Sequence, residues 1–476
     1  MDSSIETIAA LSTPSGTAAL AVVRASGPAC ASLGEQIFGK ALKHGRAYHG
    51  DYRDLEGRTV DDVIALFFQG PRSYTGEDVL EISAHGNPLI AQRILEDLFA
   101  RGCRGAEPGE FTRRAFSNGR LDLSQAEAVI DLIEARSARA LEAANQQLRG
   151  SLGRHMTKLT EGLLMILARI EAYIDFPDED LPAEDRQIVL DSLEETRRGT
   201  KRLLATQHYG DLLRDGIKTV ILGAPNAGKS SLLNALVGQE RALVSPEPGT
   251  TRDFIEERVI LGPHCIRLID TAGLRAAEGP IEKLGIQKTV ERAAEADLFL
   301  WVVDGQAVAL DGCPTWPAEL GAMPSAEKII LVLNKVDLLS ETQRAALREK
   351  APSPSSNSVE TSPGPEGIQA FPAVAAVSAL SGLGLDELIA AVIHRAESFN
   401  LIHGEETIAI NARHADALRR AEQALSRALA DLRQSGEIEL ISSDIREGLD
   451  ALGEIAGRID NERMLDHLFA TFCIGK

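Results

Sequence analysis

Cysteine is scarce in this sequence of 476 residues, and it has no long apolar run. The five cysteines stand far apart, at Cys30, Cys103, Cys265, Cys313 and Cys473. An odd number of scattered cysteines provides neither a disulfide framework nor a Cys-x-x-Cys metal knuckle, which favours a reducing compartment. No run reaches the ~20 apolar residues of a membrane span, and the N-terminus lacks the basic and apolar segments of a secretory signal. We therefore expect a cytoplasmic protein with no membrane partner.

Positive charge is also in short supply. Lysine and arginine total 50 against 70 acidic residues, giving a formal net charge of -20, which disfavours non-specific adhesion to nucleic acid or anionic lipid. A chain of 476 residues is too long for one compact core, so two to four domains are expected.

The first part of the chain, residues 1–118, mixes short β-like runs with helical stretches. This pattern predicts an α+β domain. Residues 119–214 are dominated by helical periodicity, which predicts two long helices, or one broken near Gly150 and Gly153, ending before Pro177. Residues 399–476 return to the same helical composition.

Between the two helical stretches, residues 215–398 alternate β-like and helical segments. That alternation predicts a parallel sheet with helices on both faces. We therefore expect a multidomain α/β plus all-α protein, in which this domain is inserted between two halves of one helical domain. Within it, residues 351–367 are rich in Ser, Pro and Gly and cannot bury a core, which predicts a surface insertion.

A phosphate-binding loop is the first chemical motif. "GAPNAGKS", residues 223–230, fits G-x-x-x-x-G-K-[ST] between a predicted strand and a predicted helix. Lys229 can reach the β- and γ-phosphates, and the Ser230 hydroxyl can ligate Mg²⁺. The predicted nucleotide contacts in this region are Asn226, Ala227, Gly228, Lys229, Ser230 and Ser231.

Four further motifs follow in the chain. "GTTRD", with Thr251, stands where a switch loop completes the Mg²⁺ shell. "DTAG" ends a strand-like run, so that Asp270 can hold Mg²⁺ through water and Gly273 can contact the γ-phosphate, with Thr271 and Ala272 between them.

The other two motifs concern the base. In "NKVD", formed by Asn334, Lys335, Val336 and Asp337, the final carboxylate can accept two N–H bonds from guanine. "SAL", formed by Ser378, Ala379 and Leu380, is placed to support the base. Together the five motifs resemble a GTPase G domain.

One position departs from Ras-like GTPases, which place a water-orienting Gln directly after D-x-x-G. Here that residue is Leu274, which cannot align a water, and the nearest polar candidates are Arg275, Glu278 and Glu282. The amide oxygen of Asn226 could bind a monovalent cation that stabilises developing negative charge.

The sequence as a whole resembles the MnmE (TrmE) family of tRNA-modifying GTPases. Motifs outside the G domain carry this resemblance: "TPSGTAALAVVRASG", "SYTGEDVLEISAHG", "PGEFTRRAFSNGRLDLSQAEA", "IDFPDED", "NARHADAL" and the terminal "FCIGK". Residues 351–367 alone look unlike the family.

The resemblance implies a particular set of cofactors. It implies GTP with Mg²⁺, and K⁺-stimulated hydrolysis in which Glu282 positions the water and the cation is held by Asn226, Ser245, Glu247 and Thr250. It also implies that the N-terminal domain binds a reduced folate, 5,10-methylene- or 5-formyl-tetrahydrofolate, through Arg24, Glu81, Arg120 and Lys476. The family usually has lysine in place of Arg120, and the two are not geometrically equivalent.

The partners follow from the same resemblance. They are a second copy, joined through the N-terminal domains, and an FAD-dependent MnmG (GidA)-like protein in a heterotetramer or larger complex. The implied reaction adds an aminomethyl or carboxymethylaminomethyl group to carbon 5 of the wobble uridine in tRNA. The alternatives are a stand-alone GTPase switch or ribosome-assembly factor, and a folate-binding scaffold with a degenerate G domain, which the intact G motifs argue against.

Cys473 leaves several interpretations open. It could be a small hydrophobe in a last helical turn, or a reactive thiol near the folate with a catalytic role. Prenylation is disfavoured because Gly475 and Lys476 depart from the Cys-a-a-X pattern.

Overall fold

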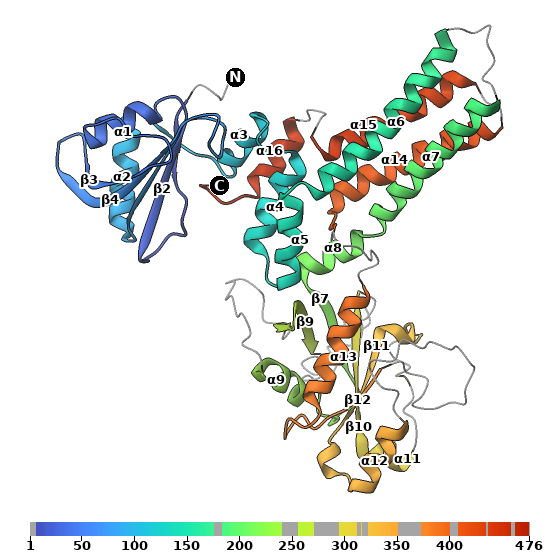
Figure 1. Ribbon diagram of the computed structural model, residues 1–476. Helices are drawn as coiled ribbons and strands as arrows, with labels where there is room; N and C mark the ends of the chain where they lie inside the picture. The colour runs from blue at the N-terminus through green and yellow to red at the C-terminus, as the bar shows by residue number, and fades with distance from the viewer. Residues whose placement is uncertain are drawn as a thin grey trace, which may run out of the picture. The chain divides into compact units, whose positions relative to one another are not determined.

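The computed structural model describes residues 6–175, 183–239, 256–270, 295–311, 316, 322–350, 373–399, 408–434, 437–457 and 462–475. Its contacts divide the chain into two compact units. The first comprises Met1–Ile130, Gln147–Thr200 and Asp416–Lys476, and the second comprises Asp131–Gln146 and Lys201–Ala415. Each unit contains parts that are far apart in the sequence (Figure 1).

The N-terminal part of the first unit is built on a six-stranded sheet of order β3-β4-β5-β2-β1-β6. All neighbouring strands are antiparallel except β1 and β6, which makes this an α+β domain as predicted. The strands are β1 (Ile8–Leu11), β2 (Leu20–Ser26), β3 (Ala47–Arg53), β4 (Thr59–Phe68), β5 (Val79–His85) and β6 (Arg104–Gly105). The helices are α1 (Cys30–Phe38), α2 (Pro88–Ala100) and α3 (Glu110–Ser117).

The two faces of this sheet have different roles. Alternate residues such as Val23, Ala25 and Ile82 point into a core that α1 and α2 cover with Leu33, Ile94 and other apolar side chains. Because side chains alternate along a strand, Arg24 and Glu81 lie on the opposite face. They are also direct neighbours across the antiparallel pair of β2 and β5.

The helical stretch that follows begins with three helices, α4 (Leu123–Glu134), α5 (Ala138–Leu148) and α6 (Ser151–Asp175). The break at Gly150, where φ is +80°, was expected, but the break before α5 was not. It arises because Ser137 supplies a helix start: its Oγ accepts the Ala140 N–H at 3.2 Å. The further helices are α7 (Ala183–Leu204), α8 (Gln207–Asp215), α14 (Ala412–Arg433), α15 (Ile438–Ile455) and α16 (Glu462–Ala470).

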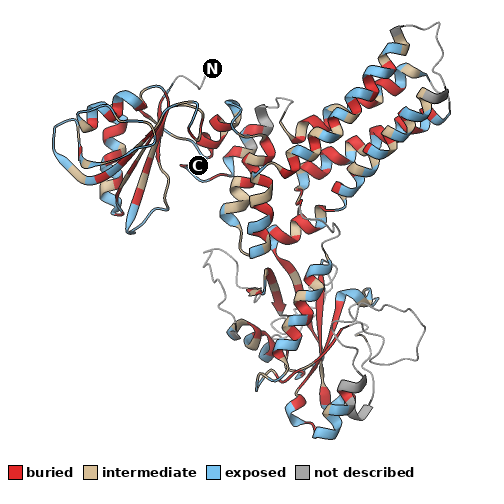
Figure 2. Cartoon of the chain, in the orientation of Figure 1, coloured by how far each residue is buried: buried red, intermediate tan, exposed pale blue. Residues whose placement is uncertain are grey.

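Helical residues from both ends of this stretch pack together. Arg446 of α15 pairs with Glu171 of α6 at 2.6 Å, and Leu123 and Ala126 of α4 share a core cluster with Leu465 and Phe469 of α16. Figure 2 shows the outcome, with one side of each long helix buried and the other exposed. No helix of the described residues is long and apolar enough to cross a membrane.

The second unit contains a six-stranded sheet of order β12-β11-β10-β7-β9-β8. Five strands are parallel, as predicted, but β8 runs antiparallel to β9 at the edge. The strands are β7 (Ile217–Leu222), β8 (Glu256–Leu261), β9 (His264–Asp270), β10 (Leu298–Asp304), β11 (Ile329–Asn334) and β12 (Val374–Ala376). Its helices are α9 (Lys229–Gln239), α11 (Gly305–Asp311), α12 (Glu341–Lys350) and α13 (Leu385–Ser398), with 3₁₀ turns η3 (Ala326–Lys328) and η4 (Val336–Leu338).

Both faces of this sheet are covered. Leu300 and Val302 of β10 point toward α9 and α13, while Phe299 and Trp301 of the same strand point into a second cluster that includes residues of α11 and α12. The carboxyl ends of the parallel strands therefore meet at one edge, where the nucleotide motifs were predicted. Residues 351–367 lie outside the described residues.

Candidate functional site

The phosphate-binding loop connects β7 to α9. Lys229 is the first residue of α9 and is 9% exposed. Its Nζ donates to the carbonyls of Gly223 and Ala224, both at 3.0 Å, so the ammonium lies over the loop that precedes it. Ser230 and Ser231 follow in the first helical turn and are exposed. A helix N-terminus that carries a lysine is suited to binding phosphate.

The backbone of this loop requires particular residues. A Cβ at Gly223, where φ is +150°, would lie 2.0 Å from the Val302 carbonyl oxygen. Asn226 adopts φ of +61°, a left-handed conformation that asparagine tolerates better than most residues, and its side chain is exposed. The loop therefore presents the Asn226 amide to solvent while its first residue, Gly223, is packed against β10.

Asn334 joins three of the predicted motifs. Its Nδ2 donates to the Ala227 carbonyl at 2.8 Å, and its Oδ1 accepts the Ala379 N–H at 3.0 Å. The same side chain leaves no room beside Gly228, where a Cβ would lie 2.2 Å from Asn334 Nδ2. The phosphate loop, "NKVD" and "SAL" thus meet around one buried amide.

The base-recognition residues are positioned by their neighbours. Lys335 has φ of +63°, and its Nζ donates to Asp304 Oδ2 at 2.8 Å. Burial acts to raise the pKa of Asp304, but the Lys335 ammonium and backbone N–H groups outweigh it and hold that pKa below its usual value. Asp337, in η4, is exposed, so its carboxylate is open to a base. Sequence reasoning missed Asp304, although an acidic residue ending a strand at this edge was a usable signal.

The "SAL" residues differ in exposure. Ser378 is fully buried and its Oγ accepts the Ser381 N–H at 3.2 Å. Leu380 is 90% exposed. The turn is therefore anchored by Ser378, and the backbone around Ala379 stays close to Asn334.

Of the remaining predicted nucleotide and cation residues, Asp270 lies among the described residues. Asp270 ends β9 at the same sheet edge as the loop. Outside the described residues lie Ser245, Glu247, Thr250, Thr251, Thr271, Ala272, Gly273 and Glu282. Among the residues that are described, no group of three His, Cys, Asp or Glu side chains could hold a metal ion. Ser230 and Asn226 are the described members of the predicted Mg²⁺ and K⁺ ligand sets.

The predicted folate residues Arg24 and Glu81 form an ion pair on the open face of the N-terminal sheet. Arg24 Nε and Nη2 both lie 2.8 Å from Glu81 Oε1. The Tyr74 and Phe111 rings flank the guanidinium, with centroids 5.5 and 5.7 Å from Arg24 Cζ. The N-terminal sheet thus brings a guanidinium, a carboxylate and two aromatic rings together at one place.

Arg120 and the C-terminal segment carry the other residues predicted for the folate site. Arg120 is exposed and follows α3, where its N–H donates to the Ala115 carbonyl at 2.8 Å. The Cys473 carbonyl accepts the Gly109 N–H at 3.4 Å, and the Gly475 carbonyl accepts Ser12 Oγ at 3.1 Å. Cys473 is exposed, so it is not a core residue. Lys476 lies outside the described residues.

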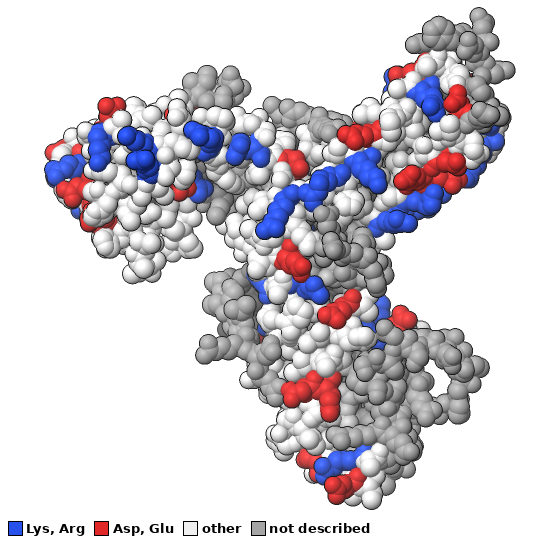
Figure 3. Space-filling view, in the orientation of Figure 1, with Lys and Arg blue, Asp and Glu red and all other residues white. Residues whose placement is uncertain are grey.

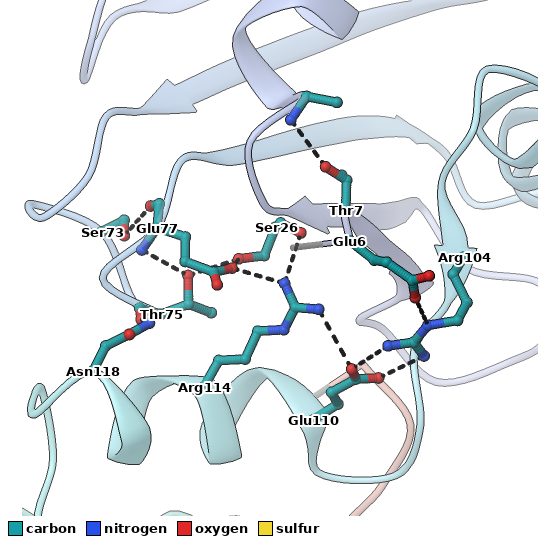
Figure 4. A network of polar contacts seen from close by, with 11 residues as sticks. Glu6, Thr7, Ser26, Ser73, Thr75, Glu77, Arg104, Glu110, Arg114 and Asn118 are labelled. Atoms are coloured by element: carbon teal, nitrogen blue, oxygen red, sulfur yellow. Dashed lines mark hydrogen bonds and ion pairs between the residues drawn. The ribbon is translucent and has the colours of Figure 1, made fainter. Parts of the chain in front are cut away.

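A buried polar network beside this site has no counterpart in the predicted residues. Figure 4 shows Arg114 of α3 between Glu77 and Glu110, with Ser26 and Thr75 close by. Arginines and acids in "SYTGED" and "PGEFTRRAF" were visible in the sequence. Their pairing was not, because Arg114 and Glu77 are 37 residues apart in the sequence.

Comparison with known proteins places this architecture in a family. The MnmE helical domain family matches residues 123–473, and the family described as GTP-binding protein TrmE N-terminus matches residues 7–120. The tRNA modification GTPase MnmE of Opitutus terrae is 54% identical over 471 residues, covering 99% of each chain. The chain belongs to the MnmE family of tRNA modification GTPases.

Other MnmE proteins match over the same length. The tRNA modification GTPase MnmE of Symbiobacterium thermophilum is 42% identical over 99% of each chain. That of Chlorobium chlorochromatii is 38% identical over 99% of this chain and 98% of its own. The family resemblance inferred from the motifs is therefore confirmed, and it extends over all the parts of an MnmE chain.

Proposed function

We propose that this chain hydrolyses GTP to GDP and phosphate and uses that reaction in modifying the wobble uridine of tRNA. The observation that carries the GTPase half is the Asn334 side chain, which joins the phosphate loop to both base-recognition motifs. In this proposal Lys229 binds the β- and γ-phosphates, Ser230 and Thr251 bind Mg²⁺, and Asp337 selects guanine. Glu282 orients the attacking water.

Hydrolysis is proposed to be stimulated by K⁺. Asn226 and the loop containing Ser245, Glu247 and Thr250 would hold the cation where other GTPases use an arginine. Support comes from the exposed Asn226 side chain at the mouth of the loop. The binding of a cation there offsets negative charge that develops as the γ-phosphate leaves.

The modification half is proposed to use a reduced folate held by Arg24, Glu81, Arg120 and Lys476. The folate supplies a one-carbon unit when bound. Arg24 and Glu81 place a donor and an acceptor together on the sheet, with the Tyr74 and Phe111 rings 5.5 and 5.7 Å from Arg24 Cζ. Cys473 is exposed on the segment that contacts the same domain, which is compatible with a role near the folate.

The proposed partners are a second copy of this chain, an FAD-dependent MnmG (GidA)-like protein and tRNA. The net charge of -20 suits a partner that supplies most of the tRNA-binding surface. On the face drawn in Figure 3, basic side chains form a continuous run over part of the described helices, with acidic side chains beside it. Tight tRNA binding by this chain alone, with a steep salt dependence, would contradict this division of labour.

Mass spectrometry of tRNA nucleosides tests the proposal. Cells lacking this chain are complemented with the intact chain, with Lys229→Ala or with Cys473→Ser. We expect the wobble modification to disappear without the chain and to return only with a GTPase-competent chain. Restoration of the wobble modification by Cys473→Ser would show that the role of the thiol is structural. Persistence of the modification without the chain would favour the alternative, a stand-alone GTPase switch or ribosome-assembly factor.

A further inference from the structure

Arg114 is a buried arginine on which three segments of the N-terminal domain converge. Its side chain is 8% exposed. Nη1 donates to Glu77 Oε2 at 2.8 Å and to the Ser26 carbonyl at 3.3 Å, and Nη2 lies 3.5 Å from Glu110 Oε1 (Figure 4). One guanidinium from α3 therefore holds the end of β2 and the loop of residues 73–77.

The loop of residues 73–77 is fixed at several points. Glu77 Oε2 also accepts Ser26 Oγ at 2.8 Å, and the hydroxyls of Ser26 and Thr75 are 2.7 Å apart. Asn118 Nδ2, just after α3, donates to the Thr75 carbonyl at 2.7 Å. The loop is thus bound to both β2 and α3, with Glu77 as the carboxylate between them.

Stability alone is a weak reason for such a network. Burying an ion pair costs desolvation, and apolar side chains of similar size often stabilise a fold as well. What distinguishes this network is the set of groups that its segments carry. Tyr74, on the loop, and Phe111, on α3, are the two rings beside Arg24, and Tyr74 Oη is 2.8 Å from Thr112 Oγ1 of the same helix.

The same loop also contacts Arg120. Gly76 has φ of +81°, and a Cβ at this position would lie 3.3 Å from Arg120 Cγ. Displacement of the loop would therefore move the surface against which the Arg120 side chain packs. It would also move Tyr74 away from Arg24.

We propose that Arg114 is a positioning residue of the folate site. It sets the spacing between the Arg24–Glu81 pair and Arg120 by holding the loop of residues 73–77 against α3. This inference rests on the proposed binding of a reduced folate at Arg24, Glu81 and Arg120.

Binding of 5-formyl-tetrahydrofolate to the full-length chain, measured by isothermal titration calorimetry, tests this role. Arg114→Met removes the charge while keeping a long side chain, and we expect the Kd to rise between about tenfold and a hundredfold. Arg113→Met is the matched control on the same helix, because Arg113 is 38% exposed and pairs with Asp466 rather than with the loop. Its Kd should stay within about twofold of the original chain.

The stoichiometry and a conservative variant separate positioning from folding. Loss of folded protein would lower the number of sites per chain, whereas displaced contacts raise the Kd at a stoichiometry near one. Arg114→Lys keeps the charge but cannot reach Glu77, Ser26 and Glu110 together, so we expect an intermediate Kd. If Arg114→Met does not fold, Arg114→Lys decides.

The outcomes distinguish the two proposals. An unchanged Kd in the folded Arg114 variants, with tight binding by the original chain, overturns the positioning role and leaves folate binding intact. No binding by the original chain overturns the proposed folate site, and the positioning role falls with it. Equal weakening of folate binding in Arg113→Met and Arg114→Met also overturns the positioning role. The weakening would then not depend on the contacts that Arg114 makes with the loop of residues 73–77.

Discussion

Asn334 donates a hydrogen bond of 2.8 Å to the Ala227 carbonyl across 107 residues of sequence. The side chain is 2% exposed, and its other atom accepts the Ala379 N–H. Asn334 therefore fixes the distance between the loop that would bind phosphates and the turn that would support the base. Because a buried partner left unsatisfied is costly, the site depends on this amide more than on any exposed residue around it.

Gly228→Ala should disrupt that junction. The new Cβ would lie 2.2 Å from Asn334 Nδ2, and φ of +94° is strained for alanine. Strain of this kind costs about 1–3 kcal/mol, so we expect GDP affinity to fall by at least about fivefold. Titration with a fluorescent GDP analogue measures this affinity. Gly238→Ala lies in α9, the helix that follows the loop, with nothing within 4 Å of the new Cβ; it is the control and should bind normally. Equal losses in both variants would contradict the argument.

Replacing K⁺ by Na⁺ should lower GTP turnover sharply. Asn226→Ala should remove most of that difference, because the amide oxygen is the proposed cation ligand. Alanine is strained at φ of +61°, whereas glycine is not. Asn226→Gly is therefore a second variant, which removes the side-chain amide without straining the backbone. Phosphate release in matched KCl and NaCl is the measurement. Equal rates of the original chain in the two salts would refute K⁺ stimulation.

Glu110 should make the stability of α3 depend on pH. Burial acts to raise the pKa of Glu110, but hydrogen bonds from Arg104 and the Glu107 N–H outweigh it, so the pKa lies below its ordinary 4.5. The ionised carboxylate therefore stabilises the fold above about pH 4.5, and this contribution is lost as pH falls through the lower folded pKa. Glu110→Gln should exchange α3 amides faster than the original chain at pH 7, with the difference narrowing below about pH 4.

Hydrogen exchange compared at each pH measures this effect. Glu107→Gln is the control, because that side chain is exposed and the contact with Glu110 is made by its backbone N–H. A difference between Glu110→Gln and the original chain that persists undiminished at pH 3 would show that the effect does not come from ionisation.

Cys473 should react with an aromatic disulfide reagent faster than the buried thiols. Burial raises the pKa of Cys103 to about 11 and also raises the pKa values of Cys30 and Cys265, whereas Cys473 is exposed. In a Cys313→Ser background we expect one fast thiol, lost in Cys473→Ser. Stopped-flow absorbance follows the reaction, and denaturation in urea should then expose the other three. A fast phase that survives Cys473→Ser would mean that a buried cysteine is accessible.

The G-domain sheet could be predicted well because each strand and its motif are local. Apolar runs such as "IKTVILG" and "KIILVLNK" identify buried parallel strands, and the motifs stand where those strands end. The antiparallel edge strand β8 was missed because its short alternating pattern is weak and sits beside a loop motif. The break before α5 was missed because a serine in a helical pattern is ambiguous until its hydroxyl is seen to cap a helix.

The N-terminal site was predicted only in part, and only by resemblance. Arg24 and Glu81 are cross-strand neighbours, which register alone reveals once the sheet is known. Arg114 and Glu77 could not be paired from sequence because their contact depends on how α3 packs against a loop 37 residues away. The roles of Lys476 and of the cation-loop residues stay predictions.

The contact between Gly475 and β1 sets an order of events during synthesis. Gly475 packs against the Leu11 carbonyl, where a Cβ would lie 2.2 Å from the oxygen, and Ser12 Oγ binds its carbonyl 463 residues along the chain. At about 5–20 residues per second, roughly 20 to 90 s pass between the appearance of these two residues at the ribosome. The N-terminal sheet must therefore persist through nearly the whole of translation with this strand end uncovered. A nascent chain that stalls late would lack the segment that contacts this strand end.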